Sequence, residues 1–332
     1  MIRVSTTLTK IQYPTYLPTW NHGQKYPALE EFVHKEHGKD ADSTFKDLLP
    51  EGSKIKKLTP TTGSEVTGVQ LSKLSDAGKD QLALLVAQRK VVAFRDQDLA
   101  SLPLQEALDF GGYFGRHHIH PTSGSPEGYP EFHLVHRYGS NGEFDQFFSG
   151  RNSSVSWHSD VTYEHQPPGT TFLYQLDAPE VGGDTLFTNQ VEAYNRLSEN
   201  LKERLHGLKA LHSGIEQAEF SRGRDGVVRR EPVTNEHPLI RTHPATGEKA
   251  IFVNQGCKFL SPQNRRKTNA HKLKVTRSIV GLKKEESEAL LNFLFLHIAR
   301  GVDYQARVRW APGTVVVWDV SKLLDSSNQT RS

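Results

Sequence analysis

Apolar residues along this chain follow two patterns, a helical period and short β-branched runs. In residues 77–89 and 284–299 they return every three to four positions, which predicts amphipathic helices. Residues 191–208 follow the same period and are predicted to form one more helix. Further helices are predicted near 28–37 and over 104–114. The remaining patterned segments are short and β-branched.

These short runs predict strands, because each is bounded by Gly, Pro, Asn or Asp and is rich in Val, Ile, Thr or Phe. One lies at 90–97, and the others crowd the second half of the chain, at 169–176, 182–189, 237–243, 247–254 and 313–319. Many short strands with turn residues between them are typical of a sandwich or barrel. We therefore predict a mostly β core with flanking helices, an α+β chain built on a jelly roll.

The 332 residues divide unevenly. Residues 1–55 show little periodicity and are predicted to be an N-terminal arm, whereas residues 56–319 carry the patterned segments of one domain. The charge is nearly balanced, with 41 basic and 38 acidic residues and a net charge of +3. That balance argues against a nucleic-acid or membrane surface.

The cysteine count and the hydropathy exclude further classes of protein. The lone Cys257 excludes a disulfide framework and a cysteine-rich metal site within this sequence. No stretch approaches the roughly 20 apolar residues that span a bilayer, and the first residues lack a signal-peptide pattern. We expect a cytoplasmic protein that acts on a small molecule. Whether it forms a symmetric homo-oligomer stays open.

His158 and Asp160 form the pair with the clearest chemistry. Residues i and i+2 of a strand point to the same face, so an imidazole and a carboxylate would lie together if this segment is a strand. Two histidines and one carboxylate form the facial triad of non-haem iron(II) oxygenases. Taken alone the pair is a weak signal, because a surface strand with two polar residues fits equally well.

Five blocks give the pair its context: FGRHHIHPTSG, WHSDVTYEHQPPGTTFLYQLDAPEVGGDTLFTNQVEAYNRLS, RTHPATGEKAIFVNQG, KKEESEALLNFLFLHI and RVRWAPGTVVVWD. In this order they resemble the taurine dioxygenase family, over about residues 57–319. The version HIHPTSGSPEGYP is most similar to fungal sulfonate dioxygenases. The resemblance implies a double-stranded β-helix (a cupin-like jelly roll) that depends on iron(II), 2-oxoglutarate and O2.

The resemblance also assigns metal and co-substrate residues. His158 and Asp160 match the first two iron ligands of the family, and Thr185 matches a threonine that bonds a carboxylate of 2-oxoglutarate. An alternative for Thr185 is a hydroxyl that only satisfies a strand end. The implied reaction hydroxylates the carbon next to a sulfonate and releases sulfite, with succinate and CO2 as co-products.

Substrate contacts follow in the same way. His120 matches a histidine that reaches the sulfonate, although a core histidine with a backbone partner is the alternative. Val161 and Tyr163 match positions that line the substrate pocket. Ser123 and Ser154 replace a Tyr and an Asn of taurine dioxygenase. The preferred substrate is therefore taurine, another alkylsulfonate or another small anion.

Two further groups are assigned no direct chemistry. A histidine cluster is expected to support the site or lie on the surface rather than hold a second metal: His117, His118, His133 and His136. An apolar stripe within residues 284–299 is expected to pack in the core: Leu290, Leu291, Phe293, Leu294 and Leu296.

The sequence departs from the family in two places. After Trp318-Asp319 the pattern breaks down, so that residues 320–332 are predicted to be an irregular, aberrant tail. Asp325 stands at the aligned position of the third iron ligand, a histidine in the family. The last core strand and two arginines, one for 2-oxoglutarate and one for the sulfonate, are predicted to be missing. A catalytically inactive product is therefore an alternative to an active dioxygenase.

Residues 258–275 form the second departure, a basic insert within a family block. Both departures begin at codons that can encode splice donors, since Val-Ser can be GTGAGT and Cys-Lys-Phe can contain GTAAGT. We interpret the insert and the tail as translated intron sequence. A solvated surface loop is the alternative for the insert.

Overall fold

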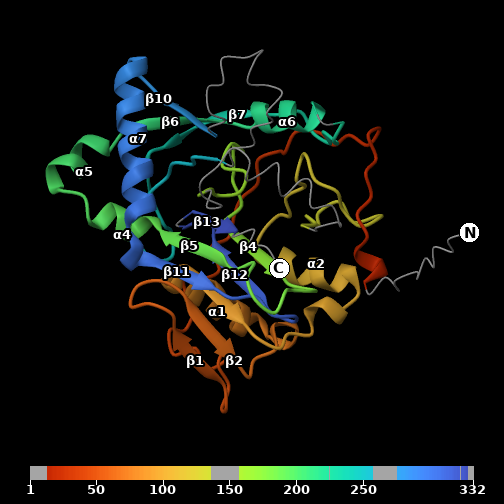
Figure 1. Cartoon of the computed structure of the whole chain (residues 1–332). Helices are drawn as coiled ribbons and strands as arrows, with labels where there is room; N and C mark the ends of the chain where they lie inside the picture. The colour runs from red at the N-terminus through yellow and green to blue at the C-terminus, as the bar shows by residue number, and fades with distance from the viewer. Residues whose placement is uncertain (1–12, 136–156, 224, 257–274, 322, 328–332) are drawn as a thin grey trace, which may run out of the picture.

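The computed structural model describes residues 13–135, 157–223, 225–256, 275–321 and, for the backbone, 323–327. In Figure 1 strands lie in the middle of the molecule and also at its top and bottom, and a long helix stands at the left. Three 3-10 helices lie in the N-terminal third and one follows the last long helix: Pro14–Tyr16, Leu71–Lys73, Leu99–Ser101 and Val302–Tyr304.

The largest sheet has five strands in the order β1-β2-β3-β12-β4. Helix α1 (Asp76–Arg89) joins β2 to β3, and these two strands are parallel, as such a crossover requires. The other pairs are antiparallel. The strands are β1 Lys54–Lys57, β2 Ser64–Thr67, β3 Val91–Phe94, β12 Val315–Asp319 and β4 Thr170–Tyr174.

A second sheet, β11-β5-β13, faces the first across a shared core. Its strands are Gln305–Val308, Thr185–Asn189 and Leu323–Ser327. Side chains alternate along β12, because successive residues of a strand point to opposite faces. Val315 and Val317 pack in the cluster that contains α1, whereas Trp318 packs on Phe187 of β5 with ring centroids 5.6 Å apart. These two layers give the mostly β core that the sequence predicted.

The remaining strands and helices cover the other end of the domain. The third sheet is β10-β6-β7 (Thr276–Ile279, Lys209–Ser213, Thr234–Pro238), and β8-β9 (Ile240–Thr242, Lys249–Ile251) is a hairpin. The helices are α2 Leu104–Gly112, α4 Gln190–Asn195, α5 Glu199–Leu205, α6 Ile215–Arg222 and α7 Lys284–Arg300. Leu291, Leu294 and Ile298 of α7 anchor the largest core cluster.

Three predicted helical features differ in the structure. No helix forms near 28–37, where the Gln166 amide instead bonds both the N–H and the C=O of Phe32. The helix predicted over 191–208 is two helices, because Ser198 begins a new one by accepting a hydrogen bond from Leu201 N. On α7, Phe293 and Leu296 are 45% and 50% exposed and thus do not join the core.

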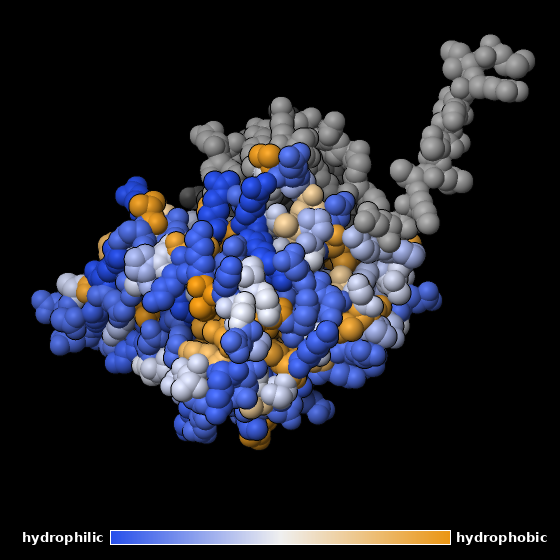
Figure 2. Space-filling model, turned by 90° about the horizontal axis from the view of Figure 1, so that it is seen from below, coloured by the Kyte–Doolittle hydropathy of each residue, from blue (hydrophilic) through white to orange (hydrophobic). Residues whose placement is uncertain are grey.

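Part of the predicted tail lies among the described residues. Residues 323–327 form β13, which pairs antiparallel with β5 and places Asp325 opposite Phe187. The predicted insert lies outside the described residues apart from Val275. None of the described helices is both long and apolar enough to span a membrane. The face in Figure 2 is mostly hydrophilic, with apolar side chains in small scattered groups.

Candidate active site

His158 and Asp160 lie side by side, with His158 Nε2 3.9 Å from Asp160 Oδ1. Their side chains are 21% and 41% exposed, so both are accessible from solvent. The prediction of a strand here is only partly right. His158 sits at an isolated bridge, whereas Asp160 begins a tight turn. The turn nevertheless brings together the imidazole and the carboxylate, as the sequence predicted.

Buried side chains from distant parts of the chain hold this turn. Asn254 Nδ2 donates to Ser159 O at 2.6 Å and to Thr162 Oγ1 at 2.9 Å. His212 Nδ1 lies 3.0 Å from the same Thr162 hydroxyl. Burial lowers the pKa of His212 to about 3, with His237 and Arg241 adding to the shift. A neutral imidazole therefore supports the turn over the whole physiological pH range.

Two more bonds come from β7. Asn235 Nδ2 donates to Tyr163 O at 2.8 Å, and His237 Nε2 donates to Glu164 O at 2.9 Å. The supporting residues were not predicted, since their partners lie 50 to 95 positions away and no motif marks them. Each of these four residues contributes at least one hydrogen bond to the turn that carries Asp160.

His120 is held in one tautomer. Its Nδ1 accepts the N–H of Thr122 at 3.3 Å, so the ring proton resides on Nε2. The Gln217 amide lies 3.2 Å from Nε2. Because Nε2 carries the proton, the amide oxygen is the atom that suits this position, with the amide nitrogen and oxygen exchanged. Burial lowers the pKa of His120 well below its ordinary value, and His133 and His118 add to the effect. His120 is therefore a neutral hydrogen-bond donor.

His133 connects His120 with the carboxylate of Asp160. The rings of His120 and His133 are 4.3 Å apart between centroids. Desolvation by the surrounding protein lowers the pKa of His133, and the nearby Asp160 carboxylate opposes the shift. The predicted substrate histidine and the predicted metal ligands thus belong to one neighbourhood.

Val161 and Tyr163 both lie in the turn, where each is almost fully buried. Val161 has a φ of 42°, which is unusual for a β-branched residue and reflects how tightly the turn is held. The Tyr163 ring packs so closely on Gly214 that a Cβ there would lie 2.9 Å from it. The Tyr163 hydroxyl is buried and has no partner among the described residues. Burial raises the pKa of Tyr163.

Thr185 begins β5, at a distance in the sequence from the turn. Its hydroxyl oxygen accepts a hydrogen bond from Trp310 Nε1 at 2.9 Å within a buried environment. A hydroxyl that accepts one bond can still donate its own hydrogen. Thr185 is thus partly engaged by the protein, in line with the strand-end alternative, and keeps one donor for a ligand.

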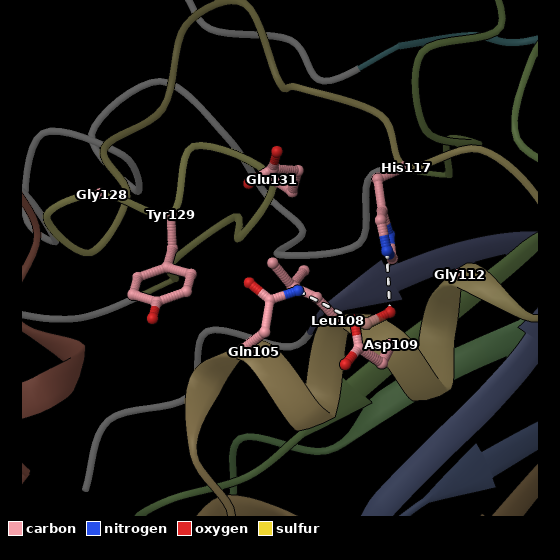
Figure 3. A pocket seen from close by; sticks show the side chains of 8 residues that line it. All are labelled: Gln105, Leu108, Asp109, Gly112, His117, Gly128, Tyr129 and Glu131. Carbon is pink, nitrogen blue, oxygen red and sulfur yellow. Dashed lines mark hydrogen bonds between the residues drawn. The ribbon is translucent and has the colours of Figure 1, made fainter.

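The other predicted histidines take supporting positions. His117 Nε2 donates to Leu108 O of α2 at 2.8 Å, and it borders a hollow of about 410 Å³ (Figure 3). This hollow contains none of the predicted site residues. His118 Nε2 lies 3.0 Å from Glu164 Oε1. The hydroxyl of Ser123 is buried with no partner among the described residues, whereas His136 and Ser154 lie outside them.

The end of β12 carries another histidine–carboxylate pair. Asp319 Oδ2 lies 3.2 Å from His243 Nε2, and both side chains are largely buried. Asp325, the aligned position of the third ligand, lies in β13. Within the part of the chain that the structure describes, no three His, Cys, Asp or Glu side chains form a group that could hold a metal ion.

Several known proteins that resemble this chain are dioxygenases. Residues 54–324 match the model of the "Taurine catabolism dioxygenase TauD, TfdA family". The chain is 42% identical, over 96% of its length and 74% of the relative, to the alpha-ketoglutarate-dependent sulfonate dioxygenase of Saccharomyces cerevisiae. It is 38% identical, over 92% of its length and 79% of the relative, to the alpha-ketoglutarate-dependent dioxygenase cnsP of Penicillium expansum.

A solved structure agrees with the fold. The crystal structure of a taurine dioxygenase from Burkholderia xenovorans is similar with a TM-score of 0.62 at 29% identity, over 83% of this chain and 84% of that chain. The predicted jelly roll is thereby confirmed. The family implies iron(II), 2-oxoglutarate (alpha-ketoglutarate) and O2. We conclude that this chain belongs to the taurine catabolism dioxygenase TauD, TfdA family and has the fold and chemistry of a 2-oxoglutarate-dependent dioxygenase.

Proposed function

We propose that this enzyme hydroxylates the carbon next to the sulfonate of a small alkylsulfonate. One oxygen atom of O2 enters that C–H bond and the other enters 2-oxoglutarate, which becomes succinate and CO2. The α-hydroxysulfonate then breaks its C–S bond to give an aldehyde and sulfite. The observation that carries the proposal is the His158–Asp160 pair, 3.9 Å apart and in one neighbourhood with the neutral donor His120.

In this proposal His158 and Asp160 are two of the iron ligands. An imidazole nitrogen and a carboxylate oxygen suit iron(II), and partial exposure keeps both side chains accessible to a metal ion. Bound iron(II) would supply the redox chemistry that activates O2. The chain itself orients the pair. Hydrogen bonds hold the turn that carries Asp160, and they come from Asn254, His212, Asn235 and His237.

Thr185 and His120 are assigned to the two anions. The free hydrogen of the Thr185 hydroxyl would donate to a carboxylate of 2-oxoglutarate, a charge-assisted bond that is stronger than a neutral one. His120 Nε2–H would donate to a sulfonate oxygen in place of its contact with the Gln217 amide. Because His120 stays neutral, it recognises the anion as a directional donor rather than as a counter-charge. Val161 and Tyr163 would supply the apolar wall beside the reacting carbon.

The test is sulfite release by the full chain with iron(II), 2-oxoglutarate and a panel of taurine, ethanesulfonate and isethionate. Hexyl sulfate and a phenoxyacetate serve as alternative anions. We expect sulfite and succinate in equal amounts from at least one sulfonate. His158→Ala and Asp160→Ala should each abolish turnover and weaken Mn(II) binding. The exposed His165, seven positions away, supplies the matched control His165→Ala, which should behave as wild type.

Each other outcome has a definite meaning. Turnover of hexyl sulfate or the phenoxyacetate alone would keep the chemistry and reject the sulfonate. Succinate formation without any product from the panel would also reject it. Mn(II) binding that is unaffected by both alanine variants would reject the assignment of the metal site.

A further inference from the structure

Two adjacent arginines, Arg229 and Arg230, lie between α6 and β7 and are each only 3% exposed. Neither belongs to the residues that the sequence singled out. Buried arginines are rare unless each charged group has partners. The partners here are the two segments that carry the candidate site, namely residues 118–125 and the turn 159–164.

Arg229 holds the backbone at His120 and just after it. Its Nε and Nη2 donate to His120 O at 3.2 and 2.8 Å, and its own N–H donates to Pro121 O at 2.7 Å. Its Nη1 donates to Ser125 Oγ at 3.0 Å. The carbonyl of His120 is therefore fixed at two points by a rigid planar group, while Thr122 fixes the ring.

Arg230 holds the other segment through Glu164. Its two terminal nitrogens donate to the two carboxylate oxygens of Glu164, with Nη1 3.1 Å from Oε2, and both side chains are 3% exposed. Burial would raise the pKa of Glu164, but the hydrogen bonds from His118 and Arg230 outweigh it and the pKa is lowered. Glu164 is therefore an ionised carboxylate in a dry, bidentate pair.

Glu164 in turn closes the turn that begins at Asp160. Its N–H donates to Val161 O at 3.0 Å. Arg230 Nη2 also donates to Ile119 O at 3.5 Å, one position before His120, and His118 Nε2 donates to Glu164 Oε1 at 3.0 Å. One guanidinium group thus ties the Asp160 turn to the His120 segment.

We infer that Arg229 and Arg230 are positioning residues of the active site. Arg229 fixes the segment that presents His120, and Arg230, through Glu164, fixes the turn that presents Asp160 relative to that segment. The inference rests on the proposed assignment of His120 and Asp160. A purely structural role would lower stability without a selective effect on metal or substrate, so the test must separate the two.

Removing Arg230 alone would leave the buried Glu164 charge unpaired and destabilise the fold for that reason alone. The informative variant is therefore Glu164→Leu with Arg230→Met, which removes both charges and keeps the volume. The matched control makes the same changes in the exposed pair nearby, Arg222→Met with Glu231→Leu. Mn(II) affinity, measured by electron paramagnetic resonance, and the unfolding midpoint are recorded for each.

We expect the buried double variant to fold and to bind Mn(II) about tenfold more weakly, the low end of the effect of outer ligand supports. The control should bind as wild type. Arg229→Met should raise the KM for the sulfonate, with Mn(II) affinity within about twofold of wild type. Arg229→Lys should recover part of the affinity for the sulfonate, because Lys keeps a hydrogen-bond donor but lacks the planar set of donors of a guanidinium group.

The inference is overturned if the buried double variant folds and binds Mn(II) as tightly as wild type. It is also overturned if Arg229→Met changes Mn(II) affinity and KM in proportion to a loss of stability. Should wild type bind Mn(II) but release no sulfite, the sulfonate proposal would fail, whereas the Mn(II) comparison would still decide the role of Arg230 and Glu164.

Discussion

Thr185 accepts the indole N–H of Trp310 and keeps its own hydrogen for a ligand. Thr185→Val should raise the KM for 2-oxoglutarate about tenfold or more, since a hydrogen bond to a charged group contributes about 1.5–3 kcal/mol. The same change leaves a buried indole N–H without an acceptor and should cost about 1–3 kcal/mol of stability. Steady-state kinetics and urea unfolding measure the two effects separately.

Thr185→Ser is the control, because it keeps the hydroxyl and loses only a methyl group. It should retain most of the affinity for 2-oxoglutarate. An unchanged KM in Thr185→Val, alongside the expected loss of stability, would assign Thr185 to the strand end alone.

His212 gives a pH dependence with a definite sign. Its pKa is about 3 in the fold, chiefly through burial, against about 6.5 for an unperturbed histidine. Between these values the unfolded chain binds a proton that the folded chain does not, so falling pH favours unfolding. We expect this group to remove about 1.4 kcal/mol of stability per pH unit below pH 6.

The measurement is urea unfolding at several pH values from 7 to 5 for wild type and His212→Gln. The variant should be less stable at pH 7, since it disturbs the buried site. Its stability should fall less steeply with pH. Equal slopes in the two proteins would show that His212 is not held neutral.

At the scale of the element, the apolar periodicity and the turn residues of the sequence predicted most of the helices and strands. α1, α7, β3 and β12 all lie where apolar period or β-branched runs predicted them. The failures have a common cause, because tertiary contacts decided them. Gln166 takes the backbone groups of Phe32 that a helix would need, and Ser198 starts a second helix within an unbroken apolar period.

The turn that begins at Asp160 is the element on which the candidate site depends. Its sequence predicted the proximity of His158 and Asp160 but not the means of holding it. The bonds from Asn254 and His212 cross 92 and 50 positions, and contacts over such separations leave no local pattern. The pairing of His158 with Asp160 could therefore be predicted from the sequence, whereas the hydrogen bonds that hold their turn could not.

Asn254→Ala tests this support. Asn254 is 1% exposed, and its amide bonds Ser159 O, Thr162 Oγ1 and Gly256 N. Its loss should lower stability by about 1–3 kcal/mol and also weaken Mn(II) binding, because the turn carries Asp160. The exposed Asn195 provides the control Asn195→Ala, with stability expected to change by less than about 0.5 kcal/mol.

A loss of stability in Asn254→Ala with wild-type Mn(II) affinity would separate the turn from the metal. Thermal unfolding and Mn(II) titration of the same samples provide both numbers. The comparison is free of substrate and therefore does not depend on which sulfonate is turned over.

At the scale of the molecule, three clusters of buried side chains among the described residues connect the sheets and helices. β12 belongs to two of them, since its alternate residues face α1 and β5. The periodic pattern therefore predicted the layers. It could not predict that β13 pairs with β5, because the sequence of that segment has no alternation of apolar and polar residues. Pairing along an open strand edge requires backbone groups more than particular side chains.

The base of the predicted insert is closed by the chain on either side of it. Asn254 N donates to Thr276 Oγ1 at 2.7 Å, and Thr276 N donates to Asn254 O at 2.9 Å, although the two residues are 22 positions apart. Gly256 N donates to Asn254 Oδ1, so the chain already turns there. A connection of three residues can span such a pair, as it does in many tight turns.

We therefore predict that a variant with residues 257–275 replaced by a single Phe folds like the full chain. Its carbonyl can take the place of Val275 O, which accepts from Ser213 N at 2.9 Å. Each halving of a loop lowers its closure cost by about 0.6 kcal/mol, so stability should be equal or higher. A matched variant with a (Gly-Ser) linker of the original length separates loop length from loop sequence. If the short variant unfolds while the linker variant stays folded, the segment is a required spacer and not a translated intron; if both fold and bind Mn(II) alike, the domain does not need it.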